Sequence, residues 1–325
     1  RNVRATIKTL DEPWDVVFAG VPQRAFVSCS WRASIQVFDP ANPAGAPVVV
    51  QLDAAAPRGL AVSPDGATVY AAIFESGNAS TILGGGLTMS GGYPPNVVSD
   101  VMGPWGGQNP PPNSGGLFNP PIAPGNAPAL PVGMIVRKNA AGNWMDDNGG
   151  NWTNLVSGAN ASRSGRPVGW DMPDRDCAII NAGTLSVGFA TGLLNIGMNL
   201  AVNPASGIVT MVGTDAMNHV RFEPVVNGKF VRVNVASFDP GAPANKSIVD
   251  LNSHLNYTVS TVARSERDKS VGDPRGIVWN SAGTRAYVAG MGSDNVLVIN
   301  AAGARAGLAP AIPVGAGPAG LPPDE

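Results

Sequence analysis

The feature that most constrains the fold is a strand–turn–strand segment that occurs twice. Residues 56–74 read APRGLAVSPDGATVYAAIF, and residues 273–290 read DPRGIVWNSAGTRAYVAG. Weaker copies keep a regular step, because 44 residues separate Pro13 from Pro57 and a further copy follows Pro274 at the same distance. A repeat near this length with paired short strands is typical of a β-propeller blade. We therefore expect an all-β propeller of about seven four-stranded blades.

Composition agrees with this fold class. The chain has 41 glycines and 30 prolines, with 14% charged and 44% hydrophobic residues. Short β-branched runs alternate with Gly, Pro, Asn and Asp, which is typical of strands and tight turns. The net charge of −2 and the lack of a basic run argue against a nucleic-acid partner. No apolar run approaches the roughly 18 residues of a membrane-spanning helix, so no transmembrane segment is expected.

The first half of the chain predicts two blades. The first blade should contain four strands, at Asp15–Ala19, Arg24–Ser28, Ser34–Asp39 and Pro47–Leu52. Residues Val3–Leu10 should form a strand that completes the last blade and removes a free sheet edge. In the second blade, Gly59–Val62 and Thr68–Ala72 flank a turn in which Gly66 can take a positive φ. This blade is expected to resume at Gly133–Lys138.

The second half predicts three further blades. Asp176–Asn181 and Thr184–Phe189 are interpreted as the outer strands of a third blade whose inner strands the sequence does not reveal. A fourth blade should contain Asn199–Pro204, Ile208–Gly213, His219–Glu223 and Phe230–Val235. A fifth should contain Gly276–Val278, Arg285–Ala289, Val296–Asn300 and a strand near Ala311–Val314. Because a sixth blade would only begin at Pro318, residues 1–325 are expected to be one propeller domain whose ring is incomplete and continues in a longer polypeptide.

Three Gly-, Pro- and Asn-rich insertions interrupt the repeat, at about 84–131, 146–169 and 239–269. Prolines remove the backbone donors that a central strand needs, so the first insertion cannot be a central strand. Loops of such length in a compact domain are usually functional. We therefore expect any binding function in these insertions.

Two cysteines, Cys29 and Cys177, lie in apolar strand-like runs. We interpret them as buried free thiols, while a disulfide would need an oxidising compartment and close Cα atoms. No CxxC or CxxCH motif occurs, so the chain itself carries no covalent haem site.

Several runs carry a family resemblance. PRGLAVSPDGATVYAA and PRGIVWNSAGTRAYVAG resemble YVTN-type β-propeller repeats. The runs GGQNPPPN, VGMIVRKNAAGNWMDDNG, WDMPDRDCAIIN and LNSHLNYTV resemble the propeller part of large secreted bacterial proteins in which a c-type cytochrome domain of the dihaem-peroxidase-like kind follows. The resemblance implies a periplasmic, secreted or cell-surface location. It also implies haem c in a domain after residue 325 or in a partner.

Candidate binding residues come from equivalent repeat positions. Arg58 and Arg275 begin corresponding inner strands, and Asp15 lies near the same place in the first blade. They would either form a polar, ligand-facing ring at one mouth of the central channel or simply cap and cross-link neighbouring blades. Further weak candidates for binding are His219, Arg221 and Trp105.

Metal ligation is a separate hypothesis. The two histidines, His219 and His254, would have to converge with a carboxylate to form a transition-metal site. Asp146 and Asp147 open an Asp/Asn/Gly run that could offer oxygen ligands to calcium, although no glutamate stands at the twelfth position of an EF-hand loop. Each residue may be read instead as a hydrogen-bonded structural residue or a turn.

Two functions follow from these observations. The first is a non-catalytic module of an extracytoplasmic redox protein that docks a haem domain or another protein partner. The second is a stand-alone binding or structural propeller at the cell surface for a protein or a glycan. Enzyme activity is left open, because a propeller enzyme with its own metal would need His219 or His254 to face the channel.

Overall fold

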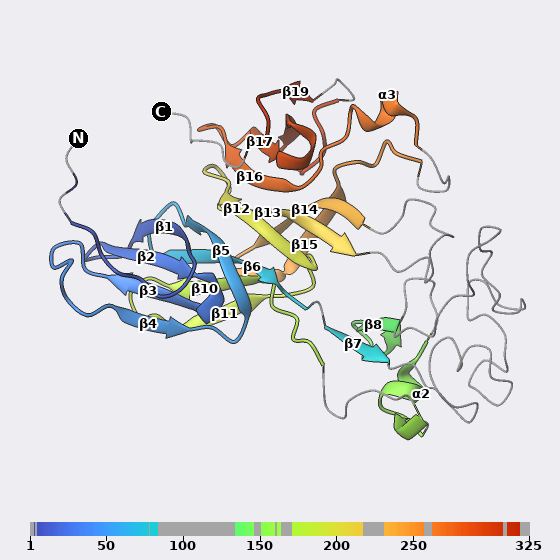
Figure 1. Cartoon of the computed structure of the whole chain (residues 1–325), viewed down its shortest axis with the longest axis horizontal. Coiled ribbons are helices and arrows are strands. Elements are labelled where there is room, and N and C mark those ends of the chain that lie inside the picture. Colours follow the sequence, from blue (N-terminus) through green and yellow to red (C-terminus); the bar gives the residue numbers. More distant parts are fainter. Residues whose placement is uncertain are drawn as a thin grey trace, which may run out of the picture.

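The chain folds mostly into β-sheets. The computed structural model describes residues 3, 5–77, 79–83, 134–145, 151–159, 161–163, 171–216, 231–256, 262–307 and 311–318. Within these ranges there are four four-stranded sheets and one three-stranded sheet. The four large sheets, numbered 1 to 4 along the chain, follow one another in a fan (Figure 1).

Sheet 1 confirms the predicted first blade. Its strands are β1 (Pro13–Ala19), β2 (Arg24–Cys29), β3 (Ser34–Phe38) and β4 (Val48–Gln51), paired antiparallel in chain order. A short 3-10 turn, η1 (Ser30–Arg32), joins β2 to β3. On β1, Val17 and Ala19 pack into the core, while Val16 and Phe18 are about half exposed. This alternation is the two-residue period of a strand.

Sheet 2 corrects two predictions. It consists of β5 (Ala55–Val62), β6 (Thr68–Glu75), β10 (Cys177–Asn181) and β11 (Val187–Ala190). β6 pairs directly with β10, so the segment at 133–138 is not part of this sheet. The strands assigned to a third blade are instead the outer strands of the second, and they therefore need no inner strands of their own. The turn between β5 and β6 is as predicted, with Gly66 at φ +70°.

Between β6 and β10 the chain leaves the fan and forms a smaller unit. A three-stranded sheet contains β7 (Ser80–Leu83), β8 (Met134–Lys138) and β9 (Trp144–Met145), and α2 (Thr153–Val156) and η2 (Ala161–Arg163) follow it. Figure 1 shows β7, β8 and α2 apart from the large sheets. The predicted insertion at 84–131 lies outside the described residues. None of the helices in the described ranges is long and apolar enough to cross a membrane.

Sheets 3 and 4 correspond to the predicted fourth and fifth blades. Sheet 3 contains β12 (Ile196–Val202), β13 (Val209–Ala216), β14 (Val231–Asp239) and β15 (Ala242–Asp250). Sheet 4 contains β16 (Pro274–Trp279), β17 (Arg285–Gly290), β18 (Asn295–Asn300) and β19 (Ile312–Pro313), with η3 (Met291–Ser293) before β18. The expected strand at His219–Glu223 lies outside the described residues. Because β13 pairs directly with β14, the strand predicted at Phe230–Val235 is the third and not the fourth strand of sheet 3.

Two further predictions are wrong. The supposed insertion at 239–269 begins with β15, the outermost strand of sheet 3, and also contains α3 (Arg264–Arg267). Its polar composition reflects a strand whose side chains are largely exposed. The leading strand expected at Val3–Leu10 does not form in the described part of that segment. Instead, the Leu10 backbone N–H donates to Gln36 Oε1 of β3 at 2.7 Å.

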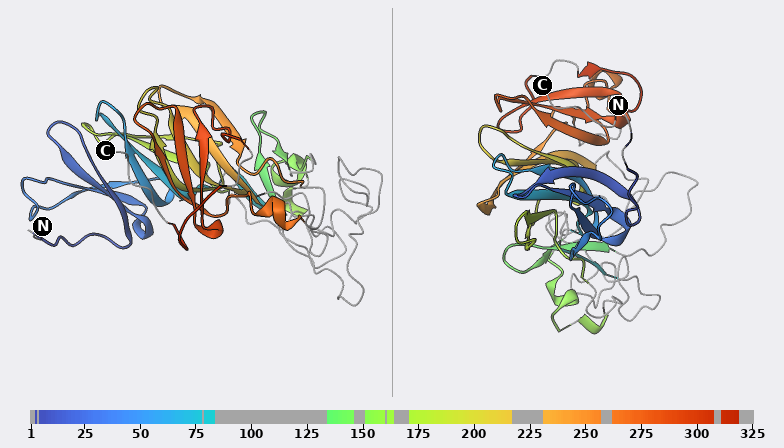
Figure 2. Two further views of the ribbon diagram at one scale, coloured as in Figure 1. Left: turned by 90° about the horizontal axis from the view of Figure 1, so that it is seen from above. Right: turned by 90° about the vertical axis from the view of Figure 1, so that its left-hand side faces the viewer.

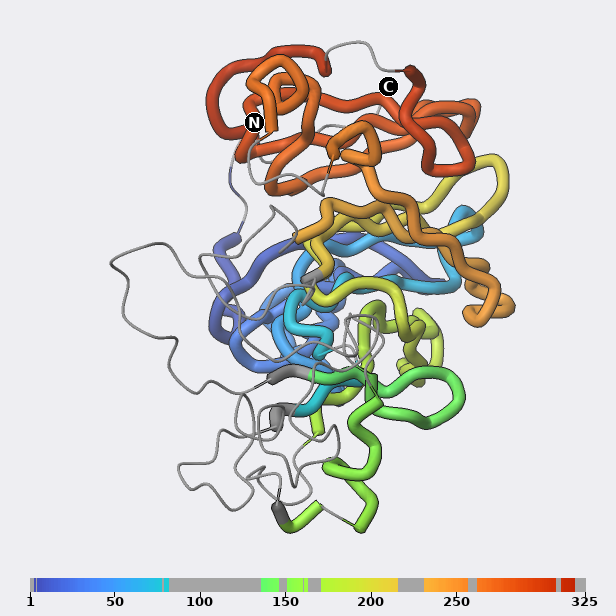
Figure 3. Tube along the Cα trace, turned by 90° about the vertical axis from the view of Figure 1, so that its right-hand side faces the viewer, coloured from blue at the N-terminus to red at the C-terminus, as the bar shows by residue number. Residues whose placement is uncertain are grey.

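The core is divided into layers between consecutive sheets. Phe26, Ile35 and Ile180 belong to the layer between sheets 1 and 2. Equivalent layers between sheets 2 and 3 and between sheets 3 and 4 contain Met211 and Val288, respectively. Figure 2 and Figure 3 show sheets 3 and 4 face to face. Each fully buried side chain of this size contributes about 1.5–3 kcal/mol, so the face-to-face layers hold the fan together.

The first strands of neighbouring sheets lie next to one another: β1 contacts β5, β5 contacts β12, and β12 contacts β16. These four are therefore the inner strands of the fan, as in a series of propeller blades. Cys29 and Cys177 are both buried and unpaired, as predicted.

Candidate functional site

The inner strands begin at one end of the fan, which we call the insertion face. The inner strands β1, β5, β12 and β16 begin at this face with Pro13, Ala55, Ile196 and Pro274, respectively. β6 ends and β10 begins at the same end, because Glu75 pairs with Ala55 and Cys177 pairs with Ala72. The long excursion between β6 and β10 therefore leaves from the insertion face.

Asp15 cross-links neighbouring sheets on this face. Its Oδ2 accepts the Leu60 N–H of β5 at 2.9 Å. In sheet 3, Asn199 occupies the equivalent repeat position and donates Nδ2 to the Arg275 carbonyl of β16 at 3.0 Å. Gly59 stands at that position in sheet 2, where a Cβ would collide with Asn199 Oδ1. The cross-linking interpretation is therefore the one that the geometry of Asp15 supports.

The preceding repeat position carries Trp14, Arg58, Met198 and Arg275 on the four inner strands. Arg275 forms an ion pair with Asp273, with 2.8 Å between Nε and Oδ1. Arg58 lies against two aromatic rings instead. Its Cζ is 3.2 Å from the ring centroid of Phe74, on the adjacent strand β6, and 4.6 Å from that of Trp14.

The charge of Arg58 is poorly compensated. Burial lowers the pKa of Arg58, and the positive charge of Arg275 lowers it further, while Glu12 and Glu75 act in the opposite sense. Its Nε is enclosed without a hydrogen-bond partner. Of the partly buried arginines whose side chains the structure describes, Arg58 is the one whose guanidinium has no hydrogen bond or ion pair among the described residues.

We call Trp14, Arg58 and Phe74 the Arg58 cluster. Sequence comparison of the repeats identified Arg58 and Arg275 but gave Phe74 no role. The hairpin register explains the contact: Pro57 pairs with Ile73, so Phe74 stands opposite Ala56 and diagonal to Arg58 on the same face. Arg58 and Arg275 lie close enough for their charges to interact, and the repeat comparison had predicted both at one mouth of the central channel.

The small sheet is joined to the same end of sheet 3 through Arg137 of β8. Arg137 Nη2 donates to the side-chain oxygen of Asn195 and lies 3.3 Å from Asp215 Oδ1. Asp215 stands opposite Arg232 in the ladder between β13 and β14. The Nε atom of Arg232 lies 3.6 Å from Asp250 Oδ2. This row of alternating charges anchors the excursion to the fan.

A buried carboxyl group, Asp176, was not identified from the sequence. Its two oxygens accept the backbone N–H groups of Leu193 and Leu194, at 2.9 and 3.0 Å. Burial raises the pKa of Asp176 to about 7, and the neighbouring Asp174 carboxyl adds to the shift. No pattern in the sequence identifies it, because its partners are backbone groups 17 and 18 residues away. These bonds tie the connection between sheets 2 and 3 to the start of β10.

His254 is held in a structural cluster and not in a metal site. Arg305 Nη1 lies 3.2 Å from His254 Nδ1. Since an arginine can only donate, Nδ1 accepts, and Nε2 donates to the Glu266 carbonyl at 3.0 Å. Both ring nitrogens are therefore occupied by protein groups.

The other predicted site residues, His219, Arg221, Trp105, Asp146 and Asp147, lie outside the described residues. Within the described ranges, no group of three or more His, Cys, Asp or Glu side chains could hold a metal ion. Asp15, Arg58 and Arg275 are brought together at the insertion face, whereas His254 lies with α3 and the turn after β18.

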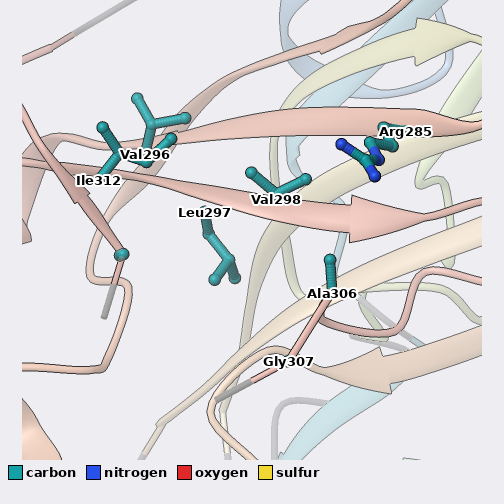
Figure 4. A pocket seen from close by; sticks show the side chains of 8 residues that line it. Arg285, Val296, Leu297, Val298, Ala306, Gly307 and Ile312 are labelled. Atoms are coloured by element: carbon teal, nitrogen blue, oxygen red, sulfur yellow. The ribbon is translucent and has the colours of Figure 1, made fainter. Parts of the chain in front are cut away.

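Two cavities lie among the described residues outside the Arg58 cluster. One, of about 270 Å³, is lined mainly by apolar side chains of sheet 4, including Val296, Val298 and Ile312, with Arg285 at one side (Figure 4). The other, of about 440 Å³, lies at the opposite end of sheets 2 and 3, beside the turn at Asp65. Neither brings together groups with an evident catalytic arrangement.

No family model and no curated protein sequence matches this chain. Among solved structures, a gluconolactonase from Xanthomonas campestris is similar at 11% identity and TM-score 0.40, covering 93% of this chain and 62% of that one. A putative 6-phosphogluconolactonase from Bacteroides uniformis is similar at 11% identity and TM-score 0.34, covering 88% and 49%. A hydrazine synthase from Kuenenia stuttgartiensis is similar at 12% identity and TM-score 0.28, covering 92% and 80%.

The chain thus spans 49–62% of the length of the two lactonase structures. Likenesses of this size carry no argument about activity, and the fold described above rests on strand pairing and sheet packing.

Proposed function

We propose that this chain is a non-catalytic docking scaffold that binds a protein partner or a fused domain through its insertion face. The observation that carries the proposal is the Arg58 cluster, in which a partly buried cation has aromatic neighbours but no described polar partner. Buried donors without acceptors are rare in folded proteins, because each costs roughly 1–3 kcal/mol of desolvation. A partner that supplies an acceptor to the terminal Nη groups of Arg58 would compensate its charge.

The frame of this scaffold is proposed to be a ring of about seven blades, of which sheets 1 to 4 are consecutive members. Support comes from sheet 1, where Val16 and Phe18 of β1 are 51% and 53% exposed. The residues equivalent to Val16 in the other sheets, Leu60, Leu200 and Ile277, are buried in the layer shared with the preceding sheet. A low-resolution solution scattering envelope of the full-length protein would test this: a disc with a central hole is expected, and an open, elongated particle would contradict it.

The redox setting is a further part of the proposal. It is supported by the resemblance to secreted propeller proteins that carry a c-type cytochrome domain. In that setting, the propeller is extracytoplasmic, haem c belongs to a following or partner domain, and this chain positions that domain. Calcium is proposed as a ligand only of the run at 146–151, of which residues 146–150 lie outside the described residues.

Site-specific photocrosslinking tests the docking function. We would place p-benzoylphenylalanine at Glu75, an exposed residue at the insertion face, in the full-length protein in its native host. The matched control is Ala41, an exposed turn residue at the opposite end of sheet 1. Glu75 should crosslink to one defined protein or domain and Ala41 should not. Equal crosslinking from both positions, or none from Glu75, would contradict the proposal.

The crosslinked product also separates the two candidate settings. A c-type haem absorbance in the product supports the redox scaffold. A haem-free surface protein as the product would replace it with the stand-alone binding propeller. Both outcomes keep the insertion face as the docking surface.

A further inference from the structure

The Arg58 cluster has the chemistry of a carboxylate site. A guanidinium group stacked on rings uses its face for the cation–π contact and keeps its in-plane N–H donors for hydrogen bonds. No described group accepts from these donors. Nε is enclosed, so a ligand would reach the two terminal Nη groups. A carboxylate fits two parallel N–H donors with two oxygens.

The charges around Arg58 restrict the ligand further. Arg275 adds a second positive charge nearby, but Asp273 pairs with it. Glu12 and Glu75 act on Arg58 as negative charges. Two arginines thus stand among three carboxylates, and such a neighbourhood would repel a polyanion such as a nucleic acid or a polyphosphate. One weakly charged acceptor is the better match.

The aromatic neighbours indicate the form in which the carboxylate arrives. Trp14 is 49% exposed and lies beside the guanidinium, so an apolar surface is offered next to the charge. Aromatic and arginine side chains together are the residue types that dominate binding energy at protein interfaces. An aspartate or glutamate on a polypeptide brings both a carboxylate and adjoining backbone to cover the ring.

We propose that the Arg58 cluster binds a single aspartate or glutamate carboxylate on a polypeptide segment of the partner, with Arg58 as the anchor and Trp14 and Phe74 fixing its guanidinium. This inference rests on the proposed docking function and names the chemistry of the partner's contact. The neighbouring ion pair of Arg275 with Asp273 limits how much negative charge the site can bind.

The test is a titration of the full chain with an acetylated Gly-Asp-Gly-Gly amide peptide, monitored by the NMR signal of the Arg58 side chain. A Gly-Asn-Gly-Gly peptide with the same caps is the matched ligand control, and acetate and inorganic phosphate distinguish a free anion from a peptide. The Asp peptide should shift the Arg58 signal and bind at least tenfold more tightly than the Asn peptide or phosphate. Loss of one charge-assisted hydrogen-bond pair corresponds to about this factor.

Three variants test whether the peptide binds at Arg58. Arg58→Met should reduce peptide affinity at least tenfold, and Arg58→Lys should reduce it several-fold because the fork is lost while the charge stays. Arg285→Met, at an exposed arginine of β17, should bind like the parent protein. Equal affinity of Arg58→Lys and the parent, or a preference for phosphate, would overturn the inference. The lysine variant keeps the test decisive even if Arg58→Met does not fold.

The two proposals fail in different ways. If Glu75 still crosslinks to its partner in Arg58→Lys with unchanged yield, the docking function stands and the carboxylate site is wrong. If the Asp peptide binds at Arg58 but Glu75 crosslinks to nothing, the site stands and the docking function is wrong.

Discussion

Two partly buried arginines, Arg305 and Arg58, show how differently the same side chain can be used. Burial lowers the pKa of both guanidinium groups. Arg305 donates to the carbonyls of Leu251 and Lys269, at 3.1 and 2.7 Å, and its Nη1 also contacts His254. Arg58 has two aromatic rings beside it and no described acceptor.

The difference separates a structural charge from one that is available to a partner. Arg305 joins three segments, namely the chain after β15, the residues after α3 and the turn after β18. The Nε groups of both arginines are enclosed without a partner, but the Nη groups of Arg305 have acceptors inside the molecule. The Nη groups of Arg58 have none among the described residues, so they are available to a partner.

The largest effect is expected when the structural charge is removed. Arg305→Met keeps the apolar stem but leaves two carbonyls and His254 Nδ1 without their donor. We expect the free energy of unfolding to fall by about 3 kcal/mol, the range for loss of charged hydrogen bonds at a partly buried site. Urea denaturation followed by tryptophan fluorescence measures it. A loss below about 1 kcal/mol would remove the contrast between the two arginines.

A buried carboxyl tests whether the same reasoning holds for an acid. The pKa of Asp176 is raised to about 7, so the folded state keeps a proton that the unfolded state releases above about pH 4. The contribution of Asp176 to the free energy of unfolding should therefore fall as pH rises from about 4 to about 7, by at most about 1.4 kcal/mol per pH unit. In Asp176→Asn this part of the slope should disappear.

Denaturation midpoints at a series of pH values check this prediction. Asp174→Asn is the companion variant, because it removes the neighbouring carboxyl that adds to the shift. Its slope should be smaller than that of the parent but not zero. Parallel pH profiles of the parent protein and Asp176→Asn would show that Asp176 is ionised when folded.

An inter-sheet hydrogen bond should have a smaller effect than the Arg305 cluster. Asn199→Ala removes the bond to the Arg275 carbonyl and should cost about 1–2 kcal/mol. Asn199→Asp introduces the residue type that Asp15 has at the equivalent repeat position. It removes the Nδ2 donor but keeps a side-chain oxygen, so it should not restore stability. Thermal unfolding compares them. Recovery in the aspartate variant would mean that the donor to Arg275 contributes nothing.

The smallest effect on stability is expected at Arg58 itself. Arg58→Met removes an uncompensated cation and keeps an apolar side chain against Trp14 and Phe74. The free energy of unfolding should change by less than about 1 kcal/mol, with either sign, because lost cation–π contact opposes relieved desolvation. Arg285→Met, at an exposed position, serves as the reference. A loss as large as that of Arg305→Met would make Arg58 a structural residue.

Local pattern predicted the strands well where a repeat was intact. The hairpin around Gly66 and the strands of sheet 1 follow from alternation and turn chemistry alone. The local sequence pattern did not predict strand pairing between segments that are far apart in the chain. β6 pairs with β10 across about a hundred residues, and no local signal distinguishes that partner from β8. Likewise β15, being mostly exposed, lacked the apolar alternation that identifies a strand.

The sequence by itself determined the strand–turn–strand unit, its step of 44 residues and the equivalence of Arg58 with Arg275. These follow from backbone propensities and from repetition, which are local properties. Only the tertiary structure decided which strands share a sheet, that Asp15 cross-links two sheets, and that Arg305 has acceptors whereas Arg58 has rings. The physical reason is that a charge is compensated by groups close in space, and the fold alone determines which groups those are.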